Sequence, residues 1–314
     1  MSFLIGIDGG GTKTHAVLTN LQGEKLFECF AGPSNFLILG TGKVSETILE
    51  LIDACKNFLN ISYSDISAVL LGTTGAGRRV DAELLENDFQ SFLNSKNISL
   101  KNFRVESDAR IALEGAFSGK PGSILIAGTG SIMFGKDNEG NIHRVGGFGR
   151  FIGDEGSGYS IGRKALTVIA KNFDGRSERT ILSDLINEKF GISSSEKLIT
   201  EVYKNNFDIA SCAPLVLHAA EAGDVAALQI IESETDELTL HIKAMKEKIK
   251  EEILSIAFIG GILSSKNFYS DLFIKKIKEQ ISKCQVQPPD YPPEYGAILM
   301  AQAYFGNHPL EKIN

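Results

Sequence analysis

The segment 8–14, Asp-Gly-Gly-Gly-Thr-Lys-Thr, has the residue types of a phosphate-binding loop. It lies between two short apolar runs, 3–7 and 15–18, which are predicted to be neighbouring strands. Glycines accept positive φ and let backbone N–H groups converge, and such a nest of amides binds anions, most often phosphate. A plain hairpin turn would also account for the glycines. It would not account for the carboxylate of Asp8 at the strand end, or for the hydroxyls and the cation that follow.

The sequence therefore predicts phosphate binding by Gly10, Gly11, Thr12 and Lys13, with Asp8 directed to Mg²⁺ either directly or through water. Because a strand and not a helix follows the glycines, the loop is neither a P-loop nor the glycine-rich turn of a dinucleotide-binding fold. The same pattern returns at 124–135, where a Gly-Thr-Gly-Ser turn again separates two apolar runs. This repeat predicts a duplicated hairpin unit, one per domain, with the two units facing each other across a cleft.

Three further positions could carry chemistry. Asp108 follows a predicted strand at 103–105 and opens a helix capped by Ser107, which places its carboxylate at the edge of a cleft. A carboxylate that only interacts with the helix dipole would occupy the same position. The segment 153–158, Gly-Asp-Glu-Gly-Ser-Gly, starts another helix with two carboxylates, which capping alone would also explain. The glycine pair after the apolar run 256–259 is explained equally well by close packing of a strand on a helix.

The elements that must position these residues are predicted from apolar periodicity. Further strands are expected at 25–30, 68–71, 103–105 and 256–262. Helices are expected at 43–60, 81–93, 107–117, 268–282 and 294–304, and the stretch 154–250 is expected to be almost wholly helical. In that stretch Leu238, Ile242, Met245 and Ile249 form an apolar stripe, and the Lys and Glu residues around it predict a solvated outer face.

Composition bounds the class of protein. The 314 residues allow two domains of ordinary size, and the net charge of −7 without a basic run makes nucleic acid an unexpected partner. The four cysteines are far apart and form no CxxC, which predicts a reducing compartment without disulfides or a cysteine metal site. The scattered histidines do not support zinc. With no signal peptide and no apolar stretch of 18 residues, no membrane partner is expected and the cytoplasm is the expected location.

Five segments occur in the order and spacing of N-acetylglucosamine kinases: 8–14, 107–109, 128–131, 153–157 and 259–262. Over nearly its whole length the chain resembles these kinases and the wider BadF/BadG/BcrA/BcrD ATPase family, part of the actin, sugar kinase and Hsp70 superfamily. The resemblance implies an α/β fold with two actin-like (ribonuclease H-like) ATPase domains facing a central cleft, the second with a large helical part. The first domain would span 1–117 together with the C-terminal helix at about 293–314. The second would span 118–292 with a helical insertion.

The resemblance also implies an activity, the transfer of the ATP γ-phosphate to the 6-hydroxyl of an N-acetylhexosamine. N-acetylglucosamine and N-acetylmuramic acid are the implied substrates, in amino-sugar salvage or cell-wall recycling. Asp108 would be the catalytic base, Thr129 and Gly130 the second phosphate loop, and Gly260 with Gly261 the pair beside the adenosine. The implied sugar-binding residues are Asn35, Asp108, Ser131, Ile132, Gly147 and Asp154. ATP and Mg²⁺ are the expected cofactors, and a homodimer is the expected assembly.

The chain departs from the family at Phe148, where a Trp usually follows the paired glycines. Phe keeps an apolar face for a sugar ring but lacks the indole N–H, so the sugar preference stays open and glucosamine remains an alternative substrate. From the sequence alone, Asn35 is explained almost as well by a simple turn. Sugar binding is expected to close the cleft about hinges near 115–123 and 288–293, which contain Gly or Pro.

Three rival functions would require a different set of residues. An ATP-driven electron-transfer activator would need cysteines for an iron–sulfur cluster, and the isolated cysteines argue against it. A non-catalytic sugar sensor or an assembly protein would not need Asp8, Asp108, Asp154 and both phosphate loops. A kinase of the zinc-containing repressor and kinase group would carry a Cys-rich zinc motif, which the sequence lacks.

Overall fold

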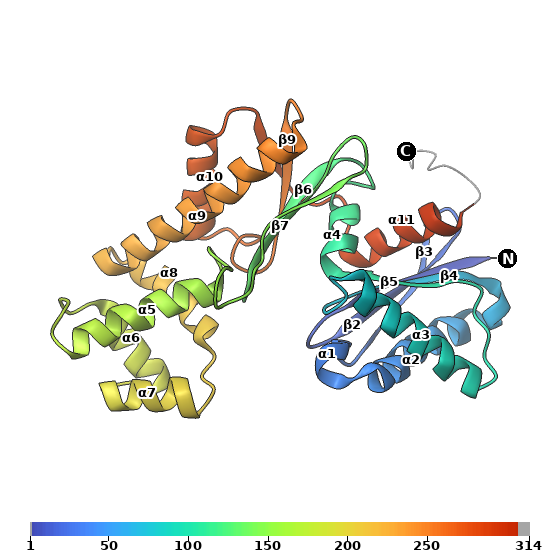
Figure 1. The fold of residues 1–314 in the computed structure, drawn as a ribbon, viewed down its shortest axis with the longest axis horizontal. Helices are drawn as coiled ribbons and strands as arrows, with labels where there is room; N and C mark the ends of the chain where they lie inside the picture. Colours follow the sequence, from blue (N-terminus) through green and yellow to red (C-terminus); the bar gives the residue numbers. More distant parts are fainter. Residues whose placement is uncertain (1, 307–314) are drawn as a thin grey trace. The chain divides into compact units, whose positions relative to one another are not determined.

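The computed structural model describes residues 2–306, and these residues form two compact units (Figure 1). One unit comprises residues 2–121 with 288–306, and the other comprises residues 122–287. The expected C-terminal helix at about 293–314 is described as far as residue 306, and its last eight positions lie outside the described residues.

The first unit is built on a five-stranded sheet of order β3-β2-β1-β4-β5. Its strands are β1 (Phe3–Gly9), β2 (Thr14–Asn20), β3 (Lys25–Ala31), β4 (Ile66–Thr73) and β5 (Phe103–Ser107). β1, β2 and β3 form an antiparallel meander, whereas β4 and β5 run parallel to β1. The predicted hairpin around the first glycine loop is therefore confirmed, with Gly9 opposite Thr14.

Helices cover both faces of this sheet. They are α1 (Phe36–Leu39), α2 (Thr41–Leu59), the short 3-10 turn η1 (Tyr63–Asp65), α3 (Arg79–Ser95), α4 (Asp108–Ala116) and α11 (Pro293–Phe305). Alternate residues of β1 face opposite layers, so that Ile5 and Ile7 pack in the core with α2 and α3 and Leu4 packs with α4 and α11. Figure 1 shows α4 and α11 side by side against the sheet. The last helix thus completes a unit whose other elements all precede residue 122.

Helices α4 and α11 approach each other closely at Gly296. We therefore predict that one methyl group added at this position lowers the stability of the protein strongly. A Cβ added at Gly296 would lie 1.8 Å from the carbonyl oxygen of Ile111 and 2.6 Å from the nitrogen of Gly115. Because both atoms are backbone, the helices must separate. Gly296→Ala is expected to lower the free energy of unfolding by about 3 kcal/mol, at the upper end of overpacking effects, as measured by urea denaturation.

The matched control is Gly42→Ala in α2, where an added Cβ meets nothing within 4 Å. This change is expected to be neutral or to stabilise by up to about 1 kcal/mol, because alanine is the better helix former. Equal effects of the two substitutions would contradict the close approach of α4 and α11.

The second unit repeats the sheet with a different set of helices. Its sheet has the order β10-β9-β6-β7-β8, formed by β6 (Gly122–Ala127), β7 (Ser131–Lys136), β8 (Ile142–Gly146), β9 (Leu254–Ile259) and β10 (Cys284–Gln287). β6, β7 and β8 form an antiparallel meander, and β9 and β10 are parallel to β6. The predicted repeat of the hairpin unit is confirmed, but β8 and β10 were not expected from the sequence.

The stretch expected to be almost wholly helical is a series of separate helices. They are α5 (Gly158–Phe173), α6 (Ile181–Phe190), α7 (Ser195–Lys204), η2 (Ile209–Cys212), α8 (Ala213–Glu221) and α9 (Val225–Ile249), and α10 (Phe268–Gln280) follows β9. The apolar stripe of α9 is buried as predicted. The prediction that its Lys and Glu residues are solvated is wrong for Glu234. This residue is buried, as is His241, because α8, α10, α5 and the sheet all pack on this helix.

Within residues 2–306, no single helix has the length and apolar character that a membrane span requires. By length and composition alone, one sharply bent pair, Ile209–Glu221 with Val225–Ile249, would meet that criterion.

Candidate active site

The parallel strands of the first unit end at one edge of the sheet and bring three predicted functional segments together. Gly9 of β1 is in register with Thr73 of β4, and Thr73 is in register with Ser107 of β5. The residues that follow these strands therefore lie side by side. They are the first glycine loop, the segment beginning at Thr74, and Asp108.

The first glycine loop is a tight turn exposed at this edge. The N–H of Gly10 donates to the carbonyl of Lys13 over 3.0 Å, which closes the turn. Gly11, Thr12 and Lys13 are exposed, and the Lys13 amine lies 5.4 Å from the centre of the Phe30 ring. This geometry suits a loop that presents backbone N–H groups and one mobile cation to an anion.

Asp8, just before this loop, is partly buried among other carboxylates. Burial, together with the negative charges of Glu294 and Asp108, raises the pKa of Asp8 to about 6, against the lowering effect of His15 and Lys13. The imidazole of His15 lies 3.1 Å from Glu294 and 3.0 Å from Glu28. A bound cation stabilises the ionised form of such a buried carboxylate more than it stabilises an exposed carboxylate. Glu294 belongs to the last helix, and no local pattern in the sequence connects it with Asp8.

Asp108 is held by two hydrogen bonds. One oxygen accepts from the N–H of Ala109 at 2.8 Å, and the other accepts from the hydroxyl of Thr74 at 2.8 Å. The predicted cap is confirmed, because the Ser107 hydroxyl accepts from the N–H of Arg110. Thr74 was not predicted as a site residue. Its hydroxyl orients the carboxylate while its N–H donates to the carbonyl of Gly9, so it ties Asp108 to the first glycine loop.

The loop that carries Asn35 is tied to the same edge. Thr14 donates to the carbonyl of Gly32 at 2.7 Å, and Thr73 donates to the carbonyl of Ser34 at 2.9 Å. The Asn35 side-chain oxygen accepts from the N–H of Leu37, so this residue caps the short helix α1. Asn35 thus has a structural task whether or not it also contacts a ligand.

In the second unit, the second glycine loop meets the start of α5. Gly158 and Tyr159 at the start of α5 donate their N–H groups to the carbonyls of Gly128 and Thr129, at 2.8 and 3.2 Å. Gly260, which follows the neighbouring strand β9, has φ +96° and lies so close to β6 that a Cβ would be 2.4 Å from the carbonyl oxygen of Ala127. Gly260 is therefore closely packed, but against a neighbouring strand and not against a helix. Gly261 has open space around its Cα, where a ligand could approach.

The sugar-binding residues predicted in the second unit cluster around Asp154. A Cβ built at Gly130 would be 2.9 Å from an Asp154 carboxylate oxygen, and one built at Gly147 would be 2.4 Å from Ile132. The buried hydroxyl of Ser131 donates to the carbonyl of Glu155 at 2.5 Å. The structure thus brings Gly130, Ser131, Ile132, Gly147 and Asp154 together within one unit.

Aromatic and cationic side chains border this cluster. Phe148 is 68% exposed, and the guanidinium of Arg144 lies 5.6 Å from its ring while donating to the carbonyls of Gly146 and Gly147. Arg150 is exposed and lies 5.1 Å from the Phe151 ring. The ring of Phe148 can contact a sugar face, and the exposed guanidinium groups of Arg144 and Arg150 can contact an acidic substituent.

Among residues 2–306, no group of three or more His, Cys, Asp or Glu side chains is arranged to hold a metal ion by itself. Cys29 and Cys55 lie near each other, with their sulfurs 3.9 Å apart, and both are free thiols, as are Cys212 and Cys284. A divalent cation held mainly by phosphate oxygens needs only one or two protein carboxylates.

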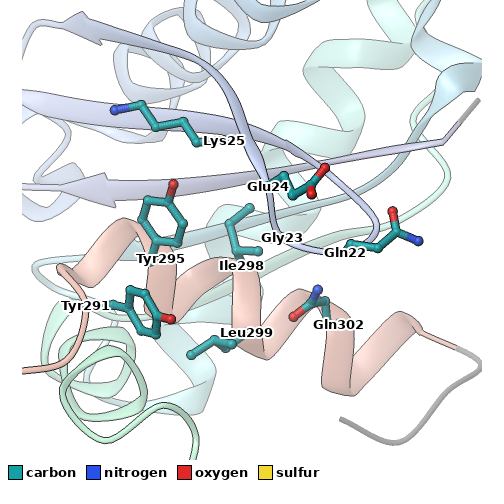
Figure 2. A pocket seen from close by; sticks show the side chains of 9 residues that line it. All are labelled: Gln22, Gly23, Glu24, Lys25, Tyr291, Tyr295, Ile298, Leu299 and Gln302. Atoms are coloured by element: carbon teal, nitrogen blue, oxygen red, sulfur yellow. The ribbon is translucent and has the colours of Figure 1, made fainter. Parts of the chain in front are cut away.

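Figure 2 shows a pocket of about 280 Å³ in the first unit, lined by residues of the β2–β3 turn and of α11. Tyr291, Tyr295 and Leu299 supply apolar surface, and Lys25 and Glu24 are among the other residues that line the pocket. It lies at the opposite end of β2 from the first glycine loop, about 20 Å away by the rise of a seven-residue strand. The pocket contains none of the predicted site residues, so we place the chemistry at the other end of the sheet, where the functional groups converge.

Comparison with solved structures shows which fold this architecture represents. A crystal structure of a protein from Chromobacterium violaceum superposes with a TM-score of 0.74, covering 96% of this chain and 99% of that protein at 24% identity. The likeness confirms the predicted actin-like fold, in which each five-stranded sheet carries one hairpin with a glycine loop.

Two curated relatives match over almost the whole chain. N-acetylmuramic acid/N-acetylglucosamine kinase of Clostridium acetobutylicum is 36% identical over 310 residues, which is 96% of this chain and 99% of the relative. N-acetyl-D-glucosamine kinase of Dictyostelium discoideum is 31% identical over 312 residues, covering 95% and 97% of the two chains. The model of one protein family matches residues 5–301. The chain belongs to the BadF/BadG/BcrA/BcrD ATPase family.

Proposed function

We propose that this protein is an ATP-dependent kinase that phosphorylates the 6-hydroxyl of an N-acetylhexosamine. The observation that carries the proposal is the alignment of Gly9, Thr73 and Ser107 at one sheet edge. This register sets an exposed glycine loop, a metal-directed carboxylate and a second carboxylate at a helix start beside one another. The names of the relatives support the same reaction, because both act on N-acetylated amino sugars and both match more than nine-tenths of this chain.

The residues fit ATP with Mg²⁺. Bound there, ATP and its metal would supply the γ-phosphoryl group and neutralise part of its charge. The exposed backbone N–H of Gly11, with Thr12 and Lys13, would hold phosphate oxygens in the turn that the N–H of Gly10 closes, and Asp8 would orient the metal. Thr129 and Gly130 would form the second phosphate contact. Gly261, with open space at its Cα, would allow the adenosine to approach the backbone.

The work of the protein in this reaction is mainly positioning. Asp108, oriented by Thr74 and by the N–H of Ala109, would accept the proton of the sugar 6-hydroxyl as the oxygen attacks phosphorus. Early proton removal is not required, because phosphoryl transfer depends mostly on alignment and charge neutralisation. The remaining sugar hydroxyls would be held by Asp154 and Asn35, whose oxygens accept hydrogen bonds in fixed directions.

We expect the substrate order N-acetylglucosamine, then N-acetylmuramic acid, with glucosamine and glucose both poor. The neutral Ser131, the apolar Ile132 and the exposed ring of Phe148 suit an acetamido group, which needs one polar partner and an apolar wall for its methyl. A substrate that lacks one methyl-sized apolar contact loses about 1–3 kcal/mol of transition-state stabilisation, and it loses more if a buried polar group of the protein is left without a hydrogen bond. Loss of the acetyl group should therefore lower kcat/KM by about 10- to 200-fold.

The test is a coupled assay of ADP release with the four sugars under one condition, with a no-sugar sample as the control for ATP hydrolysis. Arg144 and Arg150 are the cations available to the lactyl carboxylate of N-acetylmuramic acid. If glucosamine surpasses both acetylated sugars, the pocket assignment fails although the kinase assignment survives. If no sugar stimulates ADP release, the proposed reaction fails.

A further inference from the structure

We infer that Glu234 and Tyr269 are positioning residues that clamp the backbone N–H and the backbone carbonyl of Gly156 and so fix Asp154 for sugar binding. The inference rests on the proposed function, because it gives Asp154 a substrate to hold. Neither residue belongs to any of the sequence motifs of the site. Both come from helices of the second unit, α9 and α10, and both reach the loop that begins with Asp154.

Glu234 is a buried carboxylate with three donors. It is 1% exposed, and its two oxygens accept from the N–H of Gly156, from the hydroxyl of Ser160 at 2.7 Å and from the amine of Lys164 at 2.8 Å. A carboxylate this deeply buried is expensive unless it is paired and hydrogen-bonded. Replacing such a group with a well-packed apolar side chain is often neutral or stabilising, so stability alone does not account for it.

Tyr269 holds the other end of the same residue. Its ring is fully buried, and its hydroxyl donates to the carbonyl of Gly156 at 3.0 Å. Burial raises the pKa of Tyr269 well above its usual value, so the phenol remains a donor at every physiological pH. The N–H and the carbonyl of Gly156 are therefore each bound to a buried side chain from a different helix.

The loop between Asp154 and α5 needs such support. Asp154 has φ +59°, a left-handed conformation that is unfavourable for a residue with a side chain, and Gly156 has φ +79°. A Cβ at Gly156 would lie 2.2 Å from Leu238, so this backbone is pressed directly against α9. With Ser131 holding the carbonyl of Glu155, the backbone on the C-terminal side of Asp154 is anchored at three points.

This anchoring matters for binding because the Asp154 carboxylate lies against Gly130 of the second glycine loop. A small rotation of the backbone would move its oxygens away from the hydroxyls that they hold, and hydrogen bonds weaken steeply with misalignment. The clamp should thus act more strongly on sugar binding than on ATP binding, since the first glycine loop is in the other unit and only the second phosphate contact lies beside Asp154.

The test uses two isosteric substitutions in the full-length protein, Glu234→Gln and Tyr269→Phe. Each is expected to raise the KM for N-acetylglucosamine about tenfold. This is the effect of losing one well-placed hydrogen bond between the sugar and the charged Asp154 carboxylate. The KM for ATP is expected to rise by a smaller factor, because the first of its two proposed phosphate loops is in the other unit. A general loss of folded protein would lower kcat and would not raise the KM for one substrate more than the KM for the other.

Two control variants separate positioning from stability. Lys276→Met removes a buried amine that joins α10 to α9 through Asp236 at 2.5 Å and Glu232 at 2.6 Å, but it touches no residue of the Asp154 loop. It is expected to lower Tm without changing the KM for sugar. Glu247→Gln makes the same chemical change as Glu234→Gln on the exposed side of α9 and is expected to change neither quantity.

The outcomes are distinguishable. If both clamp variants phosphorylate the sugar with the wild-type KM, or if Lys276→Met raises that KM equally, the inference is overturned while the kinase assignment stands. If Glu234→Gln does not fold, Tyr269→Phe decides the matter by itself. If the wild type shows no sugar-dependent ADP release, the proposed function and the inference both fail.

Discussion

Replacing Asp108 by asparagine is expected to lower kcat by a factor of about 10²–10⁴, the usual contribution of a positioned acid–base group. The side chain keeps its shape, and an amide oxygen can still accept the hydrogen bond from Thr74. What it loses is the ability to take the proton from the sugar hydroxyl. The folded structure and the affinity for ATP should therefore be retained, as measured by thermal unfolding and by equilibrium binding of a non-hydrolysable ATP analogue.

The matched control for this change is Asp271→Asn. Asp271 also lies in the first turn of a helix, α10, where its carboxylate is exposed and interacts with the helix dipole. This variant is expected to keep the wild-type kcat and to lose at most about 1 kcal/mol of stability. If Asp108→Asn retains more than about a tenth of the wild-type kcat, Asp108 lies outside the range of a catalytic base and acts only at the helix start.

The parts of the fold that follow from local sequence could be predicted, and those set by tertiary contacts could not. The first hairpin was predictable because two apolar runs flank a glycine loop, and Ser107 was predictable as a cap because capping depends on neighbouring residues. The edge strands β8 and β10 were not predictable. Each has one partner strand and only four or five residues, which is too short for a periodic pattern of apolar residues to stand out.

Several breaks in the helical stretch have a local signal in the sequence. Gly175, Gly191 and Gly223 all have positive φ and follow helix ends, and glycine at such positions is the usual sign of a helix C-terminus. These glycines mark the ends of α5, α6 and α8, whereas α7 ends at Lys204 without a glycine after it. The burial of Glu234 had no such sign, because it depends on how many elements pack around α9.

The residues of the candidate site also fall into a group that local sequence predicts and a group that depends on tertiary contacts. Asp8, Asp108 and Asp154 stand out because each lies next to glycines or at a helix start. Their partners do not, since Thr74 is 34 residues from Asp108 and Glu234 is 78 residues from Gly156. A residue that orients a functional group from a distant element needs no motif around it. For this reason the groups that touch the ligands could be proposed from the sequence, and the groups that hold them required the structure.

Asp8→Asn is expected to stabilise the ligand-free protein and to abolish most of its activity, two effects with a common cause. The pKa of Asp8 is raised from 3.8 to about 6, so the folded protein binds the proton more tightly than the unfolded chain does. The wild type therefore loses stability as the pH rises through the window from 3.8 to about 6, and the loss is complete at neutral pH. Fully ionised, such a carboxylate costs about 3 kcal/mol, of which asparagine should recover about 1–3 kcal/mol because its amide must still be desolvated.

The measurement is urea denaturation of both proteins without nucleotide, from about pH 4 to about pH 8. The two proteins should have similar free energies of unfolding at about pH 4. The variant should become the more stable one as the pH rises to about 6, and the difference should stay constant above that pH.

Asp137→Asn is the opposite control. Hydrogen bonds from His143 and Asn141 hold the pKa of Asp137 at about 2, so removing this carboxylate should lower the free energy of unfolding at neutral pH. In the assay of ADP release, Asp8→Asn should lower kcat at least about 10²-fold, by the scale of a removed charge-stabilising group. If the variant is less stable than the wild type at pH 8, the ionised Asp8 carboxylate is already stabilised without a cation. If the variant keeps its turnover, Asp8 does not orient the metal that neutralises the phosphates.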